Sequence, residues 1–267
     1  MLKQRVMTGG GLAFGIVAVL LLSEHYWFLK AVAVILSLMA AYELCRAGEY
    51  LQQKAFLFGT MAASIFFALF GSPKLAGIVL SLALMGAIYL MRQMQNVKTA
   101  PEWMILLVAS VSAYFFGLLT EIRSQPHGFL LLTMAILIPV ITDIGAYFFG
   151  KRFGKHKLAP VISPKKTWEG SVGGTACTGV LLTLAAWILE RSGYVLVNMQ
   201  YWVNYLLTAS CISQLGDLTF STIKRITGVK DYGTILPGHG GILDRFDSLL
   251  VVIPFTVFVS RCFGPLL

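Results

Sequence analysis

The sequence is poor in charge. Only 12% of its 267 residues are Asp, Glu, Lys or Arg, and 57% are hydrophobic, whereas a soluble domain carries about a quarter charged residues. The mean hydropathy is +0.77. A soluble chain this apolar could not cover its surface with polar groups, so the composition excludes the ordinary soluble class and predicts a protein embedded in a lipid bilayer.

Cysteine is also scarce. The four cysteines are widely spaced, form no Cys-x-x-Cys pair and have no histidine at zinc-ligand spacing. They are Cys45, Cys177, Cys211 and Cys262. We interpret them as small apolar residues, and no disulfide framework is predicted.

Aspartate is absent from the first 142 residues. All five aspartates follow that point: Asp143, Asp217, Asp231, Asp244 and Asp247. Asp143 and Asp217 lie within apolar runs, where a carboxylate is costly unless it is paired, solvated or bound to a cation. Both are therefore candidate functional residues; the alternative for each is an aspartate that caps a helix or pairs with one nearby lysine.

Apolar runs long enough to cross a bilayer recur along the whole chain. Nine candidate spans lie at about 8–23, 28–45, 54–71, 74–91, 103–120, 128–149, 170–189, 202–222 and 248–265. The basic start before the first run is typical of a signal peptide, but no convincing small-residue cleavage site follows, so we expect a retained transmembrane helix.

The fold class predicted from this pattern is an all-α, polytopic integral membrane protein with about nine transmembrane helices. One membrane domain is expected over 1–267, with membrane helices in 1–142 and a catalytic half in 143–267.

The distribution of Lys and Arg predicts the orientation. With the N-terminus on the cytoplasmic side, 16 of the 21 Lys and Arg residues lie on the inner side and five on the outer side. Cytoplasmic loops collect positive charge, so the net charge of +9 has a membrane explanation. A nucleic-acid partner is not expected, and the inner cell membrane is the predicted location.

Two inner loops, at about 150–169 and 223–247, are long, and long ordered loops tend to carry function. The second combines cations, carboxylates, a histidine and a glycine cluster. Glycines let backbone N–H groups approach an oxyanion, Lys and Arg pair with phosphate oxygens, and carboxylates hold Mg²⁺. This composition favours phosphoryl or nucleotidyl transfer over a merely solvated loop.

The first loop ends in Ser163-Pro-Lys165-Lys166-Thr-Trp-Glu-Gly170. These residues are typical of a helix start with phosphate-seeking charge at its positive end. An ordinary positive-inside flank is the alternative. Lys151, Arg152, Lys155 and Lys157 fit that flank better, as positive charges that attract anionic lipid headgroups.

These two loops resemble the phosphatidate cytidylyltransferases, also called CDP-diacylglycerol synthases. The family signature has the form S-x-x-K-R-x4-K-D-x-G-x2-L-P-x-H-G-G-x2-D-R-x-D, and Ser221 to Asp247 fit every position over 27 residues. Ser163 to Gly170 is similar to the family's second motif.

The resemblance implies a reaction in which CTP and phosphatidic acid give CDP-diacylglycerol and pyrophosphate in phospholipid biosynthesis. It also implies Mg²⁺ bound by aspartates matching Asp217 and Asp244, a K⁺ ion beside it, and a homodimer.

Roles for individual residues follow as a hypothesis. Asp217 and Asp244 are the expected metal ligands, with Asp247 as a further ligand or a partner of Arg245. Asp143 and Asp231 are further candidate metal ligands: Asp143 is expected near the metal or in a polar cavity, and Asp231 is expected mainly to orient Lys230. The residues expected to contact substrate are Lys165, Lys166, Ser221, Lys224, Arg225, Lys230, Gly240, Gly241 and Arg245. His239 is expected to donate to a phosphate or orient a ligand; its alternative is a structural histidine in a glycine-rich turn.

Three other functions remain open on composition. A CTP-dependent polyprenol-type lipid kinase would transfer the terminal phosphoryl group and release CDP. A cation-coupled transporter or channel would use the intramembrane aspartates as ion sites. A purely structural scaffold would leave the buried aspartates unexplained.

Overall fold

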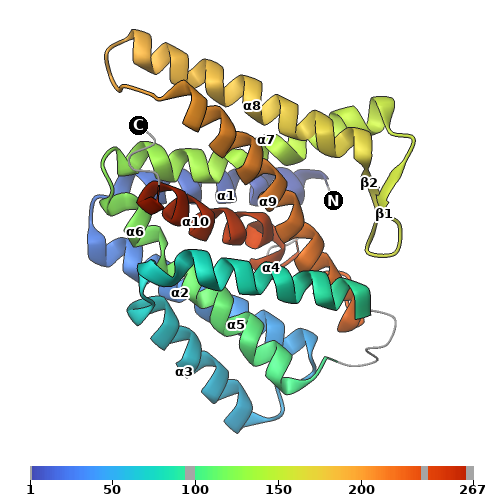
Figure 1. The fold of residues 1–267 in the computed structure, drawn as a ribbon. Helices are drawn as coiled ribbons and strands as arrows, with labels where there is room; N and C mark the ends of the chain where they lie inside the picture. The colour runs from blue at the N-terminus through green and yellow to red at the C-terminus, as the bar shows by residue number, and fades with distance from the viewer. Residues whose placement is uncertain (1, 94–99, 236–239, 263–267) are drawn as a thin grey trace.

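The computed structural model describes residues 2–93, 100–235 and 240–262, and most of them are helical (Figure 1). The helices are α1 (Leu2–Leu22), α2 (Tyr26–Ala47), α3 (Lys54–Phe70), η1 (Pro73–Leu75), α4 (Ala76–Gln93), α5 (Glu102–Gly117), α6 (Leu119–Ser124), α7 (Gly128–Phe153), α8 (Trp168–Arg191), α9 (Met199–Ile226) and α10 (Leu243–Cys262). Two short strands, β1 (Lys157–Ala159) and β2 (Ser163–Thr167), separate α7 from α8.

Five segments of the described chain are long and apolar enough to cross a membrane. They are Tyr26–Ala47, Pro73–Arg92, Glu102–Ser124, Gly128–Phe153 and Trp168–Arg191, and Thr8–Leu22 and Lys54–Phe70 are shorter apolar helices. The predicted all-α, polytopic membrane fold is therefore confirmed. The exact number of nine spans stays a prediction, because α9 and α10 do not meet the same criterion in the described residues.

Helix α10 lies at the centre of the bundle (Figure 1). Its side chains from Leu249 to Ile253 are each at most 9% exposed, and it packs against α4, α5, α7 and α9. A helix that is apolar on every side is stable only when other elements surround it. The start of α10, which carries Asp244 and Asp247, is therefore held in place by the whole bundle.

Helices α7 and α8 approach each other closely through glycine. A Cβ atom on Gly174 would lie 2.5 Å from the carbonyl oxygen of Thr142, and one on Gly170 would lie 2.7 Å from that of Ala146. Both distances are too short for any larger residue. Buried hydroxyls connect this pair to α9, since Thr142 bonds to Thr178 at 2.8 Å and to Ser210 at 2.9 Å.

The predicted loop at about 150–169 is more ordered than the sequence indicates. Helix α7 continues to Phe153, and β1 and β2 then pair antiparallel, with Lys157 opposite Thr167. The hydroxyl of Thr167 accepts a hydrogen bond from the N–H of Gly170 and caps α8. The hairpin projects beyond the ends of α7 and α8 (Figure 1), and its second strand carries Lys165 and Lys166.

Candidate active site

A polar stripe on α9 forms one wall of the site. Ser210, Gln214, Asp217, Ser221 and Lys224 follow each other at intervals of three or four residues, so their side chains share one helix face. The amide of Gln214 donates to the hydroxyl of Thr175 on α8 at 3.0 Å. The part of the stripe around Gln214 therefore packs against α8. Its charged members, Asp217 and Lys224, lie closer to the C-terminal end of α9.

Asp217 is paired with Lys166 of the hairpin. The ammonium of Lys166 contacts Oδ2 of Asp217, and both side chains are 23% exposed. Ser221, one turn further along α9, donates to Oδ1 of Asp217 at 3.3 Å. A carboxylate at this depth therefore has a cation beside it and remains partly accessible, which a ligand-binding group requires.

A second contact joins the two predicted loops. Arg225, at the end of α9, donates from Nε to the carbonyl oxygen of Ile162 at 3.3 Å. Together with the Lys166–Asp217 pair, it fixes the hairpin against α9. The two basic segments, which lie about 60 residues apart in the sequence, therefore form one site.

Asp244 lies at the first turn of α10, and three donors surround its carboxylate. Oδ1 accepts from Nζ of Lys224 at 2.9 Å, and Oδ2 accepts from the backbone N–H groups of Tyr232 and Gly241, each at 2.9 Å. The Asp244 side chain is 4% exposed and that of Lys224 is 12% exposed. In this arrangement Asp244 holds the glycine-rich segment in place through its bonds to Tyr232 and Gly241. A metal ion could bind to the Asp244 carboxylate only if Lys224 moved away from it.

The ring of Tyr232 packs against the ammonium group of Lys224. The ammonium of Lys224 lies 5.4 Å from the centre of its ring, a cation–π distance. Burial raises the pKa of the Tyr232 hydroxyl well above its ordinary value, so the hydroxyl stays protonated and donates to the carbonyl oxygen of Phe220 at 2.8 Å. Tyr232 thereby holds the segment after α9 against the helix.

Glu43, a residue of α2, reaches this site from the first half of the chain. It is fully buried, and its two oxygens accept from the backbone N–H groups of Ile242 and Leu243, each at 2.8 Å. A Cβ atom on Gly233 or on Gly241 would lie 2.5 Å from Oε1 of Glu43. These two positions therefore must be glycine while Glu43 occupies its place.

The remaining carboxylates lie around Asp217. Asp143 of α7 and Asp247 of α10 both interact electrostatically with Asp217, and Asp143 also interacts with Lys166. Asp247 is buried, and its Oδ1 accepts from the N–H of Ser248 at 2.7 Å. Three helices thus direct negative charge toward one place, which needs cations to be stable.

Other predicted substrate residues lie on the exposed rim. Lys165, Arg225, Lys230 and Arg245 are exposed, as is Asp231, which was expected to orient Lys230. Gly241 is buried, and Gly240 is half-buried with a φ of 81°. That positive φ favours glycine. His239 lies outside the described residues, so its predicted role stays a prediction.

The donor chemistry around Asp217 fits Mg²⁺. This ion prefers hard oxygen ligands and is usually held by one or two carboxylates, with substrate phosphates and water completing its coordination. The described residues contain no ready group of three His, Cys, Asp or Glu side chains placed as ligands. Asp217, partly exposed and close to two other carboxylates, is the best-placed ligand, and the substrate would have to supply the others.

Sequence reasoning did not find Glu43, Tyr232 or the Gln214–Thr175 contact. Glu43 is a lone acidic residue near the end of an apolar helix, and no local pattern indicates its contact with a segment 199 residues away. The contact of Gln214 could have been predicted in part, because an amide buried within an apolar helix needs a hydrogen-bond partner on a neighbouring element.

Comparison with known proteins shows similarity to one family over most of the chain. The profile described as "Cytidylyltransferase family" matches residues 3–263. Proteins named phosphatidate cytidylyltransferase are similar to part of the chain. The one from Staphylococcus aureus (strain COL) is 47% identical over 147 residues, which cover 54% of this chain and 54% of the relative. The one from Staphylococcus saprophyticus (strain ATCC 15305) is 49% identical over 141 residues, which cover 52% and 51%. The chain thus spans about half the length of the curated relatives that it matches.

Proposed function

This chain belongs to the cytidylyltransferase family, and from that premise we propose that it transfers the cytidylyl group of CTP to phosphatidic acid, forming CDP-diacylglycerol and releasing pyrophosphate. One observation supports this most: in a membrane-embedded chain, the basic hairpin is joined to α9 at two points, by the pair of Lys166 with Asp217 and by the hydrogen bond from Arg225 to Ile162.

The nucleophile in this proposal is a phosphate oxygen of phosphatidic acid. The second pKa of such a phosphate monoester is about 6, so the group is largely ionised at neutral pH. It attacks the α-phosphorus of CTP, and the bond from that phosphorus to the bridging oxygen of pyrophosphate breaks. A strong general base is therefore unnecessary, and the main barrier is repulsion between two anions.

The cations of the site lower that repulsion. Lys166 and Lys224 are held in fixed positions by Asp217 and Asp244, and Lys165, Arg225, Lys230 and Arg245 add positive charge at the exposed rim. We assign the rim cations to the triphosphate and the leaving pyrophosphate. Prearranged cations stabilise developing charge without reorganising during the reaction.

A divalent metal, Mg²⁺, belongs to the same proposal. Asp217 would hold it, with Asp143, Asp244 and Asp247 as the nearby carboxylates that could contribute. When bound, Mg²⁺ would neutralise charge on the phosphates of CTP. A K⁺ ion and a homodimer, both implied by the family resemblance, stay predictions.

The orientation follows from charge. With the predicted nine spans, 16 of the 21 Lys and Arg residues fall on the side of the hairpin and of the α9–α10 segment. On that basis we place both in the cytoplasm of a cell whose plasma membrane holds the protein. CTP then enters from water, while the acyl chains of phosphatidic acid stay in the bilayer.

The test uses purified protein in detergent with phosphatidic acid and Mg²⁺. CTP labelled in the cytosine and CTP labelled at the γ-phosphate are supplied in parallel. The proposal requires cytosine label in the lipid and γ-label in pyrophosphate. If γ-label enters a lipid, the protein is a kinase. If neither label is transferred with any phospholipid or nucleotide of a panel, the proposal that the protein is an enzyme is rejected.

A further inference from the structure

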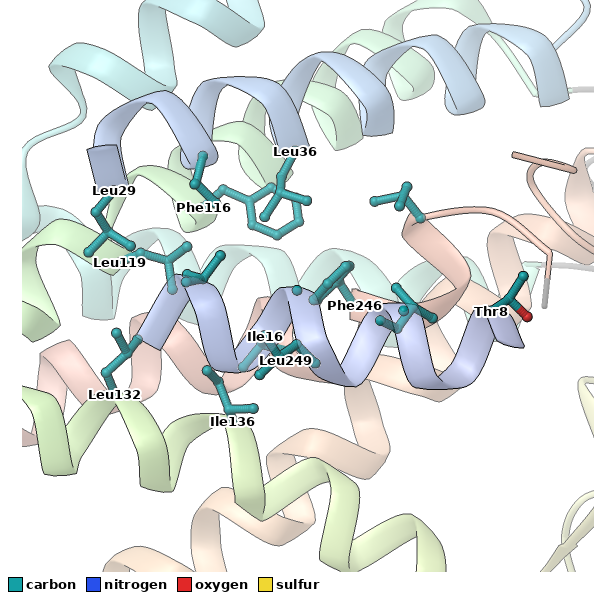
Figure 2. A pocket seen from close by; sticks show the side chains of 16 residues that line it. Thr8, Ile16, Leu29, Leu36, Phe116, Leu119, Leu132, Ile136, Phe246 and Leu249 are labelled. Atoms are coloured by element: carbon teal, nitrogen blue, oxygen red, sulfur yellow. The ribbon is translucent and has the colours of Figure 1, made fainter. Parts of the chain in front are cut away.

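An apolar cavity of about 420 Å³ lies between α1, α2, α7 and α10. Figure 2 shows side chains such as Leu36, Phe116, Ile136 and Phe246 around α1, and among the described residues that line the cavity only Thr8 has a polar side chain. The volume lies in the usual range of ligand sites, roughly 300–1,000 Å³. Water has too few polar partners to be stable in such a space, so hydrocarbon is the occupant that its chemistry selects.

One end of the cavity lies beside the start of α10. Ile242, the residue before α10, lines the cavity, and its N–H donates to Glu43 at 2.8 Å. Phe246 and Leu249 follow at spacings of four and three residues, so the two side chains continue from Ile242 along one side of α10. Exposed Arg245 lies in the same turn, next to this stripe.

Helix α2 forms another wall of the cavity, and its lining residues also follow one another toward the site. Leu29, Val32 and Leu36 line the cavity, and continuing their spacing through Ala40 leads to Glu43. At a rise of 1.5 Å per residue, Leu29 to Glu43 covers roughly 20 Å. One end of the cavity therefore lies beside Ile242, next to the segment that carries Asp244, and the rest runs into the apolar part of the bundle. A molecule with one polar end and one long apolar end fits this arrangement.

We propose that this cavity holds one acyl chain of the phosphatidic acid substrate while its phosphate lies among the charged side chains at the start of α10. This assignment rests on the proposed function. It gives α1, which contributes no side chain to the polar site in the described residues, a role as the wall that covers the bound chain.

Two glycines of α1 allow the cavity to be filled without disturbing the backbone. Gly11 and Gly15 line it, and a Cβ atom on either would meet no other atom within 4 Å. Gly11→Leu and Gly15→Leu therefore place a side chain where the acyl chain would lie. Gly10 is also open but does not line the cavity, so Gly10→Leu is the matched control on the same helix.

Gly86→Leu provides a second control. Gly86 lines another apolar cavity, between α4, α5 and α9, and its Cβ position is equally open. This variant shows whether an effect on KM is specific to the cavity beside α1 or follows from filling any apolar cavity of the bundle.

The measurement compares phosphatidic acid carrying two hexadecanoyl chains with phosphatidic acid carrying two hexanoyl chains. We expect Gly11→Leu and Gly15→Leu to raise KM for the long-chain substrate about 3- to 10-fold, because the displaced chain loses packing contacts but stays in apolar surroundings. KM for the short-chain substrate should not change, and both controls should behave as wild type. An unchanged ratio of the two KM values in both cavity variants, or an equal change in either control, overturns the assignment. Wild-type protein that makes no CDP-diacylglycerol from either substrate refutes the proposed function instead.

A direct readout does not depend on the variants folding or on turnover. Wild-type protein is irradiated with phosphatidic acid that carries a diazirine at the end of one acyl chain, and the labelled peptides are identified by mass spectrometry. Label on α1 or on Phe246 that excess phosphatidic acid removes and excess phosphatidylcholine does not remove supports the assignment. Label that both lipids remove equally marks a site for bulk lipid and overturns it.

Discussion

Glu43 accepts a hydrogen bond of 2.8 Å from the backbone N–H of Ile242, a residue 199 positions further along the chain. A second bond of the same length joins Glu43 to Leu243. These bonds attach α2 to the first turn of α10, next to Asp244. The N-terminal half of the chain is therefore part of the architecture of the site as well as of its membrane embedding.

Glu43→Gln should weaken both the fold and the activity. An amide has one oxygen, so it can accept from one of the two N–H groups and presents its own NH₂ to the other. Leaving a buried donor unsatisfied costs about 1–3 kcal/mol, and the unfolding free energy in detergent should fall by that amount. Glu43→Asp, which keeps two oxygens on a shorter arm, should recover more activity than Glu43→Gln. Equal activity in both variants would refute the positioning role.

Gly241→Ala should disturb the same contact from the other side. Its Cβ atom would lie 2.5 Å from Oε1 of Glu43, so either the glycine-rich segment or Glu43 must shift. We expect a large loss of turnover, measured as kcat for CDP-diacylglycerol formation. Gly59→Ala is the control, because its Cβ meets no atom within 4 Å. A Gly241→Ala enzyme with wild-type kcat contradicts the packing described here.

Lys224→Met should destabilise the protein strongly. The Lys224–Asp244 pair is nearly buried, and removing one member of such a pair costs about 3–5 kcal/mol, because the other charge is left without a partner. Chemical unfolding monitored by tryptophan fluorescence measures the loss. The double variant Lys224→Met with Asp244→Asn removes both charges but keeps an amide oxygen that can accept from the N–H groups of Tyr232 and Gly241, so it should recover part of the stability. No recovery would mean that the pair does not account for the loss.

Asp217→Asn should abolish turnover with little effect on folding. The side chain is partly exposed, so the amide can stay solvated, but it loses the charge expected to hold Mg²⁺ and to position Lys166. Isothermal titration of Mg²⁺ in the presence of CTP should show weaker binding than wild type, and Asp231→Asn, on the exposed rim, should bind as wild type. Unchanged Mg²⁺ binding by Asp217→Asn rejects this residue as a ligand.

Much of the site follows from sequence, because its signals are local. Aspartates within apolar runs and lysines before a helix mark Asp217 and Lys166, and the structure brings these two residues together. The long apolar runs also predict most of the helices. Helix α9 is the least clear of them, since its stripe from Ser210 to Lys224 lowers its hydropathy.

Other features have no local signal. The contact of Glu43 with α10 depends on the packing of helices from both halves of the chain. The β1–β2 hairpin is too short to show an alternating pattern. The environment of Asp244 was also not predictable, because two of its three donors are backbone N–H groups whose positions only the folded segment fixes.

The most direct test of the central claim is transfer of α-³²P label from CTP to phosphatidic acid by wild-type protein and by Asp217→Asn, both shown to be folded. The account predicts that wild type places the label in CDP-diacylglycerol and releases one unlabelled pyrophosphate for each lipid formed, and that Asp217→Asn transfers none. Labelled lipid formed equally well by both proteins would contradict the assignment of the reaction to this site, and no labelled lipid from wild type would contradict the reaction itself.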